Sequence, residues 1–199
     1  MRLELDFFRK MLYFVDVKFQ VNLPNILSSL RILMAPVVFV LIWNISEEIY
    51  PVLLIFYVTT VLLDFFDGYL ARKLAQETEL GKILDPVADK LLTVFLVIAL
   101  ICKAEFPLWL ALTVFIRDFI ILLASMILYK ERHKVQPSVI IGKVTFFMLT
   151  FLLFIYIVDL KPTVDLIVFK HFFSVTTFTF LLWSFYEYFK IYERAKDGS

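Results

Sequence analysis

The stretch that decides the fold and the chemistry of this chain covers residues 64–89 and reads DFFDGYLARKLAQETELGKILDPVAD. Its four aspartates, Asp64, Asp67, Asp85 and Asp89, lie in or beside long apolar segments. A charged side chain at the centre of a bilayer costs roughly 2.5–3.5 kcal/mol on insertion scales. Four carboxylates in such segments therefore require a compensating cation, and an ionisable cluster of this kind indicates a functional site.

The composition around this stretch is typical of a membrane protein. The 199 residues are 61% hydrophobic, include 23 phenylalanines and have a mean hydropathy of +0.85, whereas soluble domains average about 45–50% apolar residues. The apolar residues form long runs separated by short polar breaks, as expected of helices that cross a bilayer. The net charge of +1 gives no information about partners, and we expect no nucleic-acid partner.

The apolar runs predict an all-α integral membrane protein with six transmembrane helices, each near the ~20 residues that a bilayer requires. Their expected bounds are Leu23–Trp43, Val52–Arg72, Leu84–Cys102, Leu108–Tyr129, Val139–Val158 and Leu166–Lys190. Residues 1–20 mix charged and apolar side chains at spacings that suit an amphipathic helix at the membrane interface, with a frayed terminus as the alternative. We expect residues 21–199 to form one membrane domain.

Basic residues in the short loops predict the orientation of the helices. The loops on one side of the membrane hold only Lys103 and Lys161. The other side holds Arg72, Lys73, Lys82, Lys130, Arg132, Lys134, Arg194 and Lys196. By the positive-inside rule, both termini and the four aspartates face the cytoplasm, where a water-soluble substrate would reach them.

The spacing of the aspartates predicts one shared site. Residues three and four apart lie on one face of a helix, so Asp64 and Asp67 form one stripe and Asp85 and Asp89 another. The short connection between the two helices predicts antiparallel neighbours, which brings the four carboxylates to one cleft. Oxygen ligands favour Mg²⁺, or Mn²⁺ and Ca²⁺, over metals that prefer sulfur or imidazole. Because Mg²⁺ usually combines a few carboxylates with substrate phosphates, the pattern indicates a phosphorylated ligand containing a pyrophosphate.

Small residues and one arginine accompany the aspartates. Gly68, Ala71 and Gly81 remove bulk beside the carboxylates and leave room for a large ligand. Arg72 supplies a planar guanidinium that suits phosphate. Close helix packing is the better explanation for each glycine taken alone, but the combination with four spaced aspartates favours a ligand site.

Taken together, these positions resemble the signature of the CDP-alcohol phosphatidyltransferases. Every position of that signature is filled, as Asp64-x2-Asp67-Gly68-x2-Ala71-Arg72-x8-Gly81-x3-Asp85-x3-Asp89. The likeness extends to the phosphatidylglycerophosphate synthase branch of the family. It rests there on Asn22-Leu23-Pro24-Asn25 with Arg31 and Pro36, on the segment LDPVADK at residues 84–90, and on Gly142-Lys143.

This resemblance implies six transmembrane helices, a homodimer and two divalent cations, Mg²⁺ or Mn²⁺, in a cytoplasm-facing cavity of a prokaryotic inner or plasma membrane protein. The implied reaction displaces CMP from CDP-diacylglycerol by an alcohol. By position, Asp64, Asp67 and Asp85 would bind the metals, and Asp89 would complete the metal site and act as the base on the acceptor hydroxyl. The CDP part would be held by Gly68, Ala71, Arg72 and Gly81.

The acceptor alcohol is less clearly indicated. Candidate acceptor-binding residues are Arg31, Lys90, Arg117, Lys134 and Lys143, and such cations favour a phosphorylated acceptor, glycerol 3-phosphate. The pair Arg117-Asp118 departs from the Arg-Glu that phosphatidylglycerophosphate synthases often carry. It looks more like the cardiolipin synthases of the same superfamily, whose acceptor is phosphatidylglycerol. A structural Arg–Asp pairing with a neighbouring helix is another explanation for Arg117, and a snorkelling side chain is another for Lys143. Inositol phosphate, serine or an amino alcohol stays open as acceptor.

Two other classes of protein carry acidic residues in membrane helices. Intramembrane prenyltransferases use aspartates and Mg²⁺, but their motifs lack the Asp-Gly-x2-Ala-Arg continuation. A cation transporter or channel is the non-enzyme alternative, although the inverted repeats frequent in transporters are not evident in this sequence. Release of CMP that depends on CDP-diacylglycerol distinguishes a lipid transferase from both.

Overall fold

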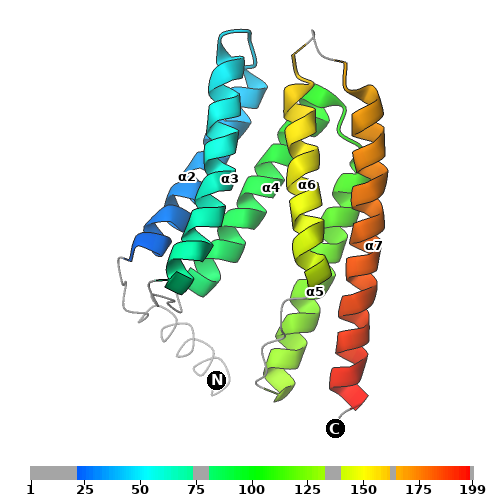
Figure 1. Cartoon of the computed structure of the whole chain (residues 1–199). Helices are drawn as coiled ribbons and strands as arrows, with labels where there is room; N and C mark the ends of the chain where they lie inside the picture. The colour runs from blue at the N-terminus through cyan, green and yellow to red at the C-terminus, as the bar shows by residue number, and fades with distance from the viewer. Residues whose placement is uncertain (1–21, 74–80, 133–139, 162–164, 198–199) are drawn as a thin grey trace, which may run out of the picture. The chain divides into compact units, whose positions relative to one another are not determined.

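The fold is described from a computed structural model, which covers residues 22–73, 81–132, 140–161 and 165–197. These ranges contain six helices and no strand (Figure 1). The helices are α2 (Leu23–Trp43), α3 (Ile49–Lys73), α4 (Gly81–Ala104), α5 (Leu108–Arg132), α6 (Ile140–Val158) and α7 (Ile167–Asp197). Each of the six expected segments contains a helix, within a few residues of its expected bounds except at the end of α7. That all six helices cross a membrane stays a prediction.

The last helix is longer than its apolar run. The membrane segment was expected to end at Lys190, and α7 continues past it to Asp197. The added residues are mostly polar and charged and contain no glycine or proline, so nothing in their chemistry stops a helix. The candidate membrane span within α7 ends at Ile191, one residue beyond the expected end of the membrane segment.

Four of the helices are long and apolar enough to cross a membrane, and they make this chain a membrane protein. The candidate spans are Asn25–Trp43, Ile49–Phe66, Ile140–Val158 and Ile167–Ile191. The other two helices, α4 and α5, are not among these candidate spans. The first half of α4 carries the charged residues Asp85, Asp89 and Lys90, and many side chains of α5 are not among the described ones. The interfacial helix predicted for residues 1–20 also lies outside the described residues.

The chain divides into two compact units. One comprises Met1–Asn44 and Pro51–Leu96, and the other Ile45–Tyr50 and Val97–Ser199. The first unit therefore holds α2, most of α3 and the first part of α4. The second holds the end of α4 together with α5, α6 and α7.

Within the first unit, α3 and α4 run side by side in opposite directions, as the short connection predicted (Figure 1). Buried apolar residues from each helix form the core, among them Val38, Leu53 and Ala88. Phe39 of α2 packs edge-to-face against Phe95 of α4, with ring centroids 5.8 Å apart, a favourable geometry for aromatic pairs. This packing brings the polar ends of three helices together.

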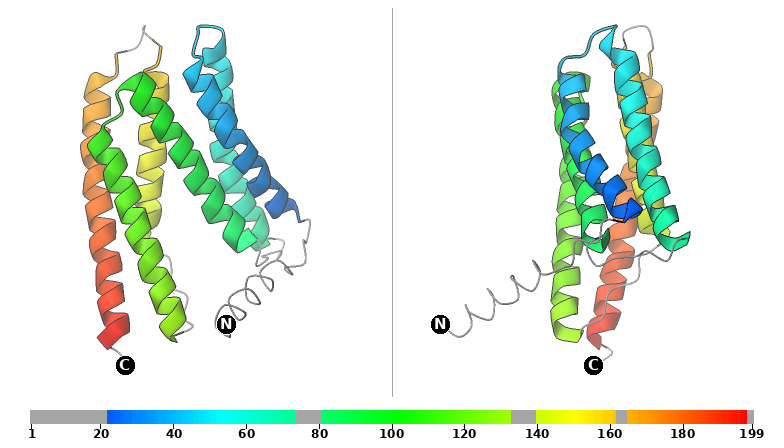
Figure 2. Two further views of the ribbon diagram at one scale, coloured as in Figure 1. Left: turned by 180° about the vertical axis from the view of Figure 1, so that it is seen from behind. Right: turned by 90° about the vertical axis from the view of Figure 1, so that its left-hand side faces the viewer.

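Within the second unit, α6 and α7 are antiparallel neighbours, and both views of Figure 2 show α5 beside α7. The hydroxyl of Thr145 on α6 donates to the carbonyl of Phe180 on α7 at 3.1 Å. At the turn between these helices, Lys170 Nζ lies 2.5 Å from Asp159 Oδ2, and Asp159 Oδ1 accepts a hydrogen bond from the Leu166 amide at 3.2 Å. These polar contacts fix the pairing of α6 and α7, because an alternative pairing would leave them unmade in an apolar setting.

Candidate active site

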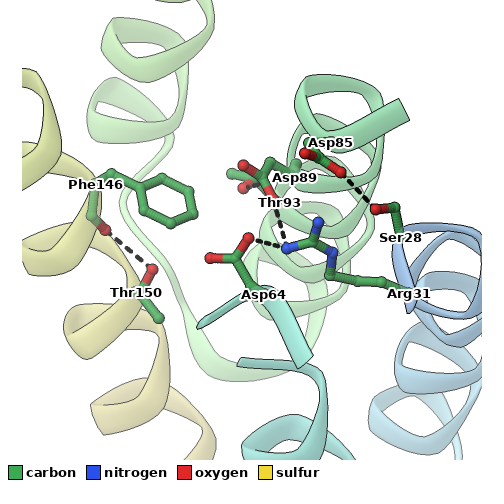
Figure 3. A network of polar contacts seen from close by, with 8 residues as sticks. All are labelled: Ser28, Arg31, Asp64, Asp85, Asp89, Thr93, Phe146 and Thr150. Carbon is green, nitrogen blue, oxygen red and sulfur yellow. Dashed lines mark hydrogen bonds and ion pairs between the residues drawn. The ribbon is translucent and has the colours of Figure 1, made fainter. Parts of the chain in front are cut away.

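Arg31 of α2 lies at the centre of a polar cluster in the first unit (Figure 3). Its side chain is completely buried, at 0% exposure. Its Nη1 pairs with Oδ1 of Asp64 on α3 and lies 2.9 Å from Oδ1 of Asp89 on α4. A buried charge is tolerated where it is paired and hydrogen-bonded. The two carboxylates therefore compensate the buried positive charge of Arg31. The guanidinium in turn offsets the repulsion between the two carboxylates.

Ser28 lies one turn before Arg31 on α2 and contacts Asp85, the third aspartate of this cluster. Its side chain is buried, and its hydroxyl donates to Oδ1 of Asp85 (Figure 3). Because the two residues are three apart, they share one face of α2. That single face thus contacts Asp64 of α3 and both aspartates of α4. Ser28 was not predicted as a site residue, and its spacing from Arg31 is the only sequence signal that could have found it.

Asp64, Asp85 and Asp89 are the predicted site residues that the structure brings together. Asp67 follows Asp64 by three positions on α3, but its side chain lies outside the described part of the chain. Four residues were predicted to bind CDP, and their side-chain surroundings also lie outside the described part of the chain. These residues are Gly68, Ala71, Arg72 and Gly81. Their roles stay predictions.

Two of the carboxylates that pair with Arg31 are partly exposed. Asp64 and Asp89 keep 33% and 28% of their side-chain surface exposed, whereas Arg31 has none. The guanidinium therefore neutralises them from the interior of the unit. Their outer surface stays accessible to a ligand.

The donor set suits a hard divalent cation. Carboxylate oxygens are the ligands that Mg²⁺ and Ca²⁺ prefer, and oxygens of Asp64 and Asp89 already converge on one cationic group. Among the described side chains, no group of three or more metal-ligating residues is placed to hold a metal ion. That set does not include Asp67, so the structure describes part of the predicted ligand set.

A second polar cluster surrounds Arg117 of α5 in the second unit. Its Nη1 lies 2.6 Å from Oδ1 of the adjacent Asp118, and its Nη2 donates to the Ser184 hydroxyl of α7 at 2.5 Å. The Tyr188 ring, one turn further along α7, has its centroid 5.6 Å from the guanidinium carbon, within cation–π range. The ion pair that we considered for Arg117 is thus present, but within its own helix. The contact with a neighbouring helix is made through Ser184 and Tyr188.

Gly142 of α6 makes room for this cluster. A Cβ atom at Gly142 would lie 3.2 Å from the Tyr188 hydroxyl oxygen and 3.6 Å from Nη2 of Arg117. The absence of a side chain therefore allows Tyr188 to lie against α6 while its ring covers Arg117. Lys143, the next residue, is exposed, and so is Lys90 on α4. Lys134 lies outside the described residues.

We expect Gly142→Leu to destabilise the protein by about 1–3 kcal/mol, the usual cost of overpacking. The new side chain would overlap Tyr188, which the Arg117 cluster holds in place. Thermal unfolding in detergent measures the effect. Lys143→Leu is the matched control, because it adds an apolar side chain at the neighbouring exposed position. An unfolding temperature of Gly142→Leu equal to that of the control would contradict the packing described here.

The sequence family follows from comparison with known proteins. The family model for CDP-alcohol phosphatidyltransferase matches residues 21–184. The chain belongs to the CDP-alcohol phosphatidyltransferase family. The resemblance inferred from the aspartate signature is thereby confirmed. Enzymes of this family generally depend on divalent metals, in agreement with the chemistry of the carboxylate cluster.

Three relatives carry the same name, CDP-diacylglycerol–glycerol-3-phosphate 3-phosphatidyltransferase. The protein of Aquifex aeolicus (strain VF5) is 35% identical over 126 residues, which are 62% of this chain and 68% of the relative. That of Rickettsia bellii (strain RML369-C) is 38% identical over 106 residues, or 53% and 58%. That of Bacillus subtilis (strain 168) is 34% identical over 110 residues, or 49% and 57%. The matches thus span between 57% and 68% of the length of these relatives.

Proposed function

We propose that this transferase moves the phosphatidyl group of CDP-diacylglycerol to glycerol 3-phosphate and releases CMP. The observation that carries the proposal is the convergence of Asp64 and Asp89, both partly exposed, on one cationic group in a chain of this family. The name of the three relatives supports the choice of acceptor. The similarity of the first helix and of residues 84–90 to the phosphatidylglycerophosphate synthases supports the same choice.

We propose that Asp64, Asp67, Asp85 and Asp89 hold two divalent ions, with Mg²⁺ as the physiological ion and Mn²⁺ as a substitute. Bound there, such ions would neutralise the charge of the pyrophosphate. The Ser28 hydroxyl orients Asp85, and Arg31 holds Asp64 and Asp89 toward each other. Gly68, Ala71, Arg72 and Gly81 would receive the CDP part.

The proposed chemical step needs one proton acceptor. The oxygen of the acceptor hydroxyl forms a bond to the phosphatidyl phosphorus, and the bond from that phosphorus to the CMP oxygen breaks. The hydroxyl proton passes to the carboxylate of Asp89, and CMP leaves with the bonding electrons. A positioned base of this kind contributes roughly 10²–10⁴-fold to the rate. The 28% exposure of Asp89 leaves part of its carboxylate open to an incoming hydroxyl.

For the acceptor phosphate, Arg117 is a better candidate than Arg31. Arg31 has no exposed surface and pairs with two carboxylates, so we no longer place it on the acceptor side. Arg117 is 16% exposed, and Ser184 and Tyr188 fix its guanidinium. Its buried Nε has no hydrogen-bond partner among the described residues. We propose that Arg117 binds the acceptor phosphate, with Lys143 and Lys134 contributing charge.

The membrane arrangement is also a proposal. We propose that α4 and α5 cross the bilayer together with the four candidate spans, which gives six crossings. The basic residues of the loops support cytoplasmic termini and a cytoplasm-facing site in a prokaryotic inner or plasma membrane. We also propose an interfacial role for residues 1–20 and a homodimer, as the family resemblance implies.

A cardiolipin synthase that uses phosphatidylglycerol is the second candidate, and one contact favours it. Asp118 lies 2.6 Å from Nη1 of Arg117 and neutralises part of the charge that a phosphate dianion would use. An acceptor with a singly charged phosphodiester makes a smaller demand on Arg117. The cation-transporter and prenyltransferase alternatives have no support from the family match.

CMP release by the purified full chain in detergent tests the function. Glycerol 3-phosphate, phosphatidylglycerol and inositol phosphate are offered separately with CDP-diacylglycerol and Mg²⁺. We expect release with glycerol 3-phosphate and its loss when EDTA replaces Mg²⁺. Release with phosphatidylglycerol alone would establish the second candidate. Release with inositol phosphate alone, or with none of the three, would overturn both acceptor assignments.

A further inference from the structure

We infer that Arg31 is an internal counter-cation of the aspartate site, which balances Asp64 and Asp89 when no divalent ion is bound and lowers the affinity of the site for that ion by like-charge repulsion. The inference rests on the proposed function, in which the aspartates bind a divalent cation. It assigns Arg31 an electrostatic role in place of a contact with either substrate.

The guanidinium of Arg31 contacts two of the three helices of its unit. Arg31 extends from α2 and meets a carboxylate from each of the two other helices of its unit, Asp64 from α3 and Asp89 from α4 (Figure 3). One nitrogen, Nη1, makes both ion pairs. A cation is therefore already located where two proposed metal ligands converge, and it is fully buried there.

The positive charge of Arg31 balances part of the negative charge of the aspartates. Two carboxylates from neighbouring helices repel each other at close range when nothing neutralises them. Arg31 supplies one positive charge against the three described carboxylates of Asp64, Asp85 and Asp89, so negative charge remains at the site. The site can therefore hold together without a metal and still attract one.

The charge of Arg31 would also oppose the binding of a metal ion. The guanidinium that pairs with these carboxylates would repel a divalent ion that they held, and such repulsion is strong in a partly buried site. Removing the charge of Arg31 should thus weaken the metal-free protein and strengthen metal binding. A residue that only positions the aspartates predicts the opposite for the metal, because its loss would let the ligands move apart.

Ser28 provides a matched control for this distinction. Its hydroxyl holds Asp85 from the same face of α2, but it carries no charge. Ser28→Ala therefore removes a positioning contact and leaves the charge unchanged. Arg31→Lys is the complementary variant, because it keeps the charge and loses the planar guanidinium.

The experiment measures thermal unfolding of the full chain in detergent, first in EDTA and then along a titration with Mg²⁺ alone. For Arg31→Gln we expect a lower unfolding temperature in EDTA and a half-saturating Mg²⁺ concentration at least about tenfold below that of the unaltered protein. Arg31→Lys should keep the unaltered half-saturation. Ser28→Ala should not lower it. A half-saturation of Arg31→Gln equal to or above that of the unaltered protein would overturn the inference.

A double variant keeps the test decisive if Arg31→Gln does not fold without metal. Adding Asp64→Asn removes one of the carboxylates that Arg31 balances. We expect the double variant to be more stable in EDTA than Arg31→Gln alone, since the two changes are coupled through one ion pair. A double variant no more stable than the single one would contradict the charge-balancing role. If Mg²⁺ does not change the unfolding of the unaltered protein, the metal proposal and the lowered affinity fail together, and this comparison still decides the charge-balancing role.

Discussion

Asp89→Asn is expected to lower kcat for CMP release by about 10²–10⁴-fold. The amide cannot take the proton of the acceptor hydroxyl, and it removes one negative charge from the proposed metal site. The change is nearly isosteric, and its amide oxygen can still accept a hydrogen bond from Nη1 of Arg31, which lies 2.9 Å from the carboxylate. The protein should therefore fold. The measurement is the rate of CMP release at saturating CDP-diacylglycerol and glycerol 3-phosphate.

Asp165→Asn is the control for this variant. Asp165 is exposed and its carboxylate accepts a hydrogen bond from the Ile167 amide at 3.0 Å at the start of α7. Asparagine makes the same capping contact, so the control should retain the unaltered rate. Asp89→Asn that unfolds like the unaltered protein and keeps a substantial part of its activity would remove Asp89 as the base.

Arg117→Ala is expected to raise KM for glycerol 3-phosphate by roughly tenfold to a hundredfold. Hydrogen bonds to charged groups contribute roughly 1.5–3 kcal/mol, and each 1.4 kcal/mol is about a factor of ten. The KM for CDP-diacylglycerol should stay as it is, because we assign Arg117 to the acceptor alone. Steady-state kinetics with each substrate varied in turn gives both constants.

Two further variants separate binding of the acceptor from support of the fold. Arg117→Lys keeps the charge but cannot reproduce the fork that contacts Asp118 and Ser184, so an intermediate KM is expected. Ser184→Ala removes only the contact to Nη2 and should raise the same KM less. An unchanged KM for glycerol 3-phosphate in Arg117→Ala, or an equal rise for both substrates, would assign Arg117 a structural role.

The sequence predicted the helix bounds well where the residues that start a helix and the apolar run mark the same segment. α2 has the predicted bounds, Leu23–Trp43, because Pro24 in its first turn and the apolar run that follows mark the same segment. α7 extends past its apolar run to Asp197, because its polar end is helical without being apolar. Spacing predicted that Asp85 and Asp89 share one face of α4, and the short connection before α4 predicted that Asp64 of α3 lies near them.

The sequence by itself determined the membrane character, the six helices and the aspartate signature, because each depends on composition or on spacing within one segment. Only the tertiary structure decided which cation meets those aspartates. Arg31 is separated from Asp64 by 33 positions, and as an isolated basic residue it suited the acceptor equally well. Which carboxylates a buried guanidinium reaches depends on how α2, α3 and α4 pack against one another, and no periodicity within a single helix contains that information.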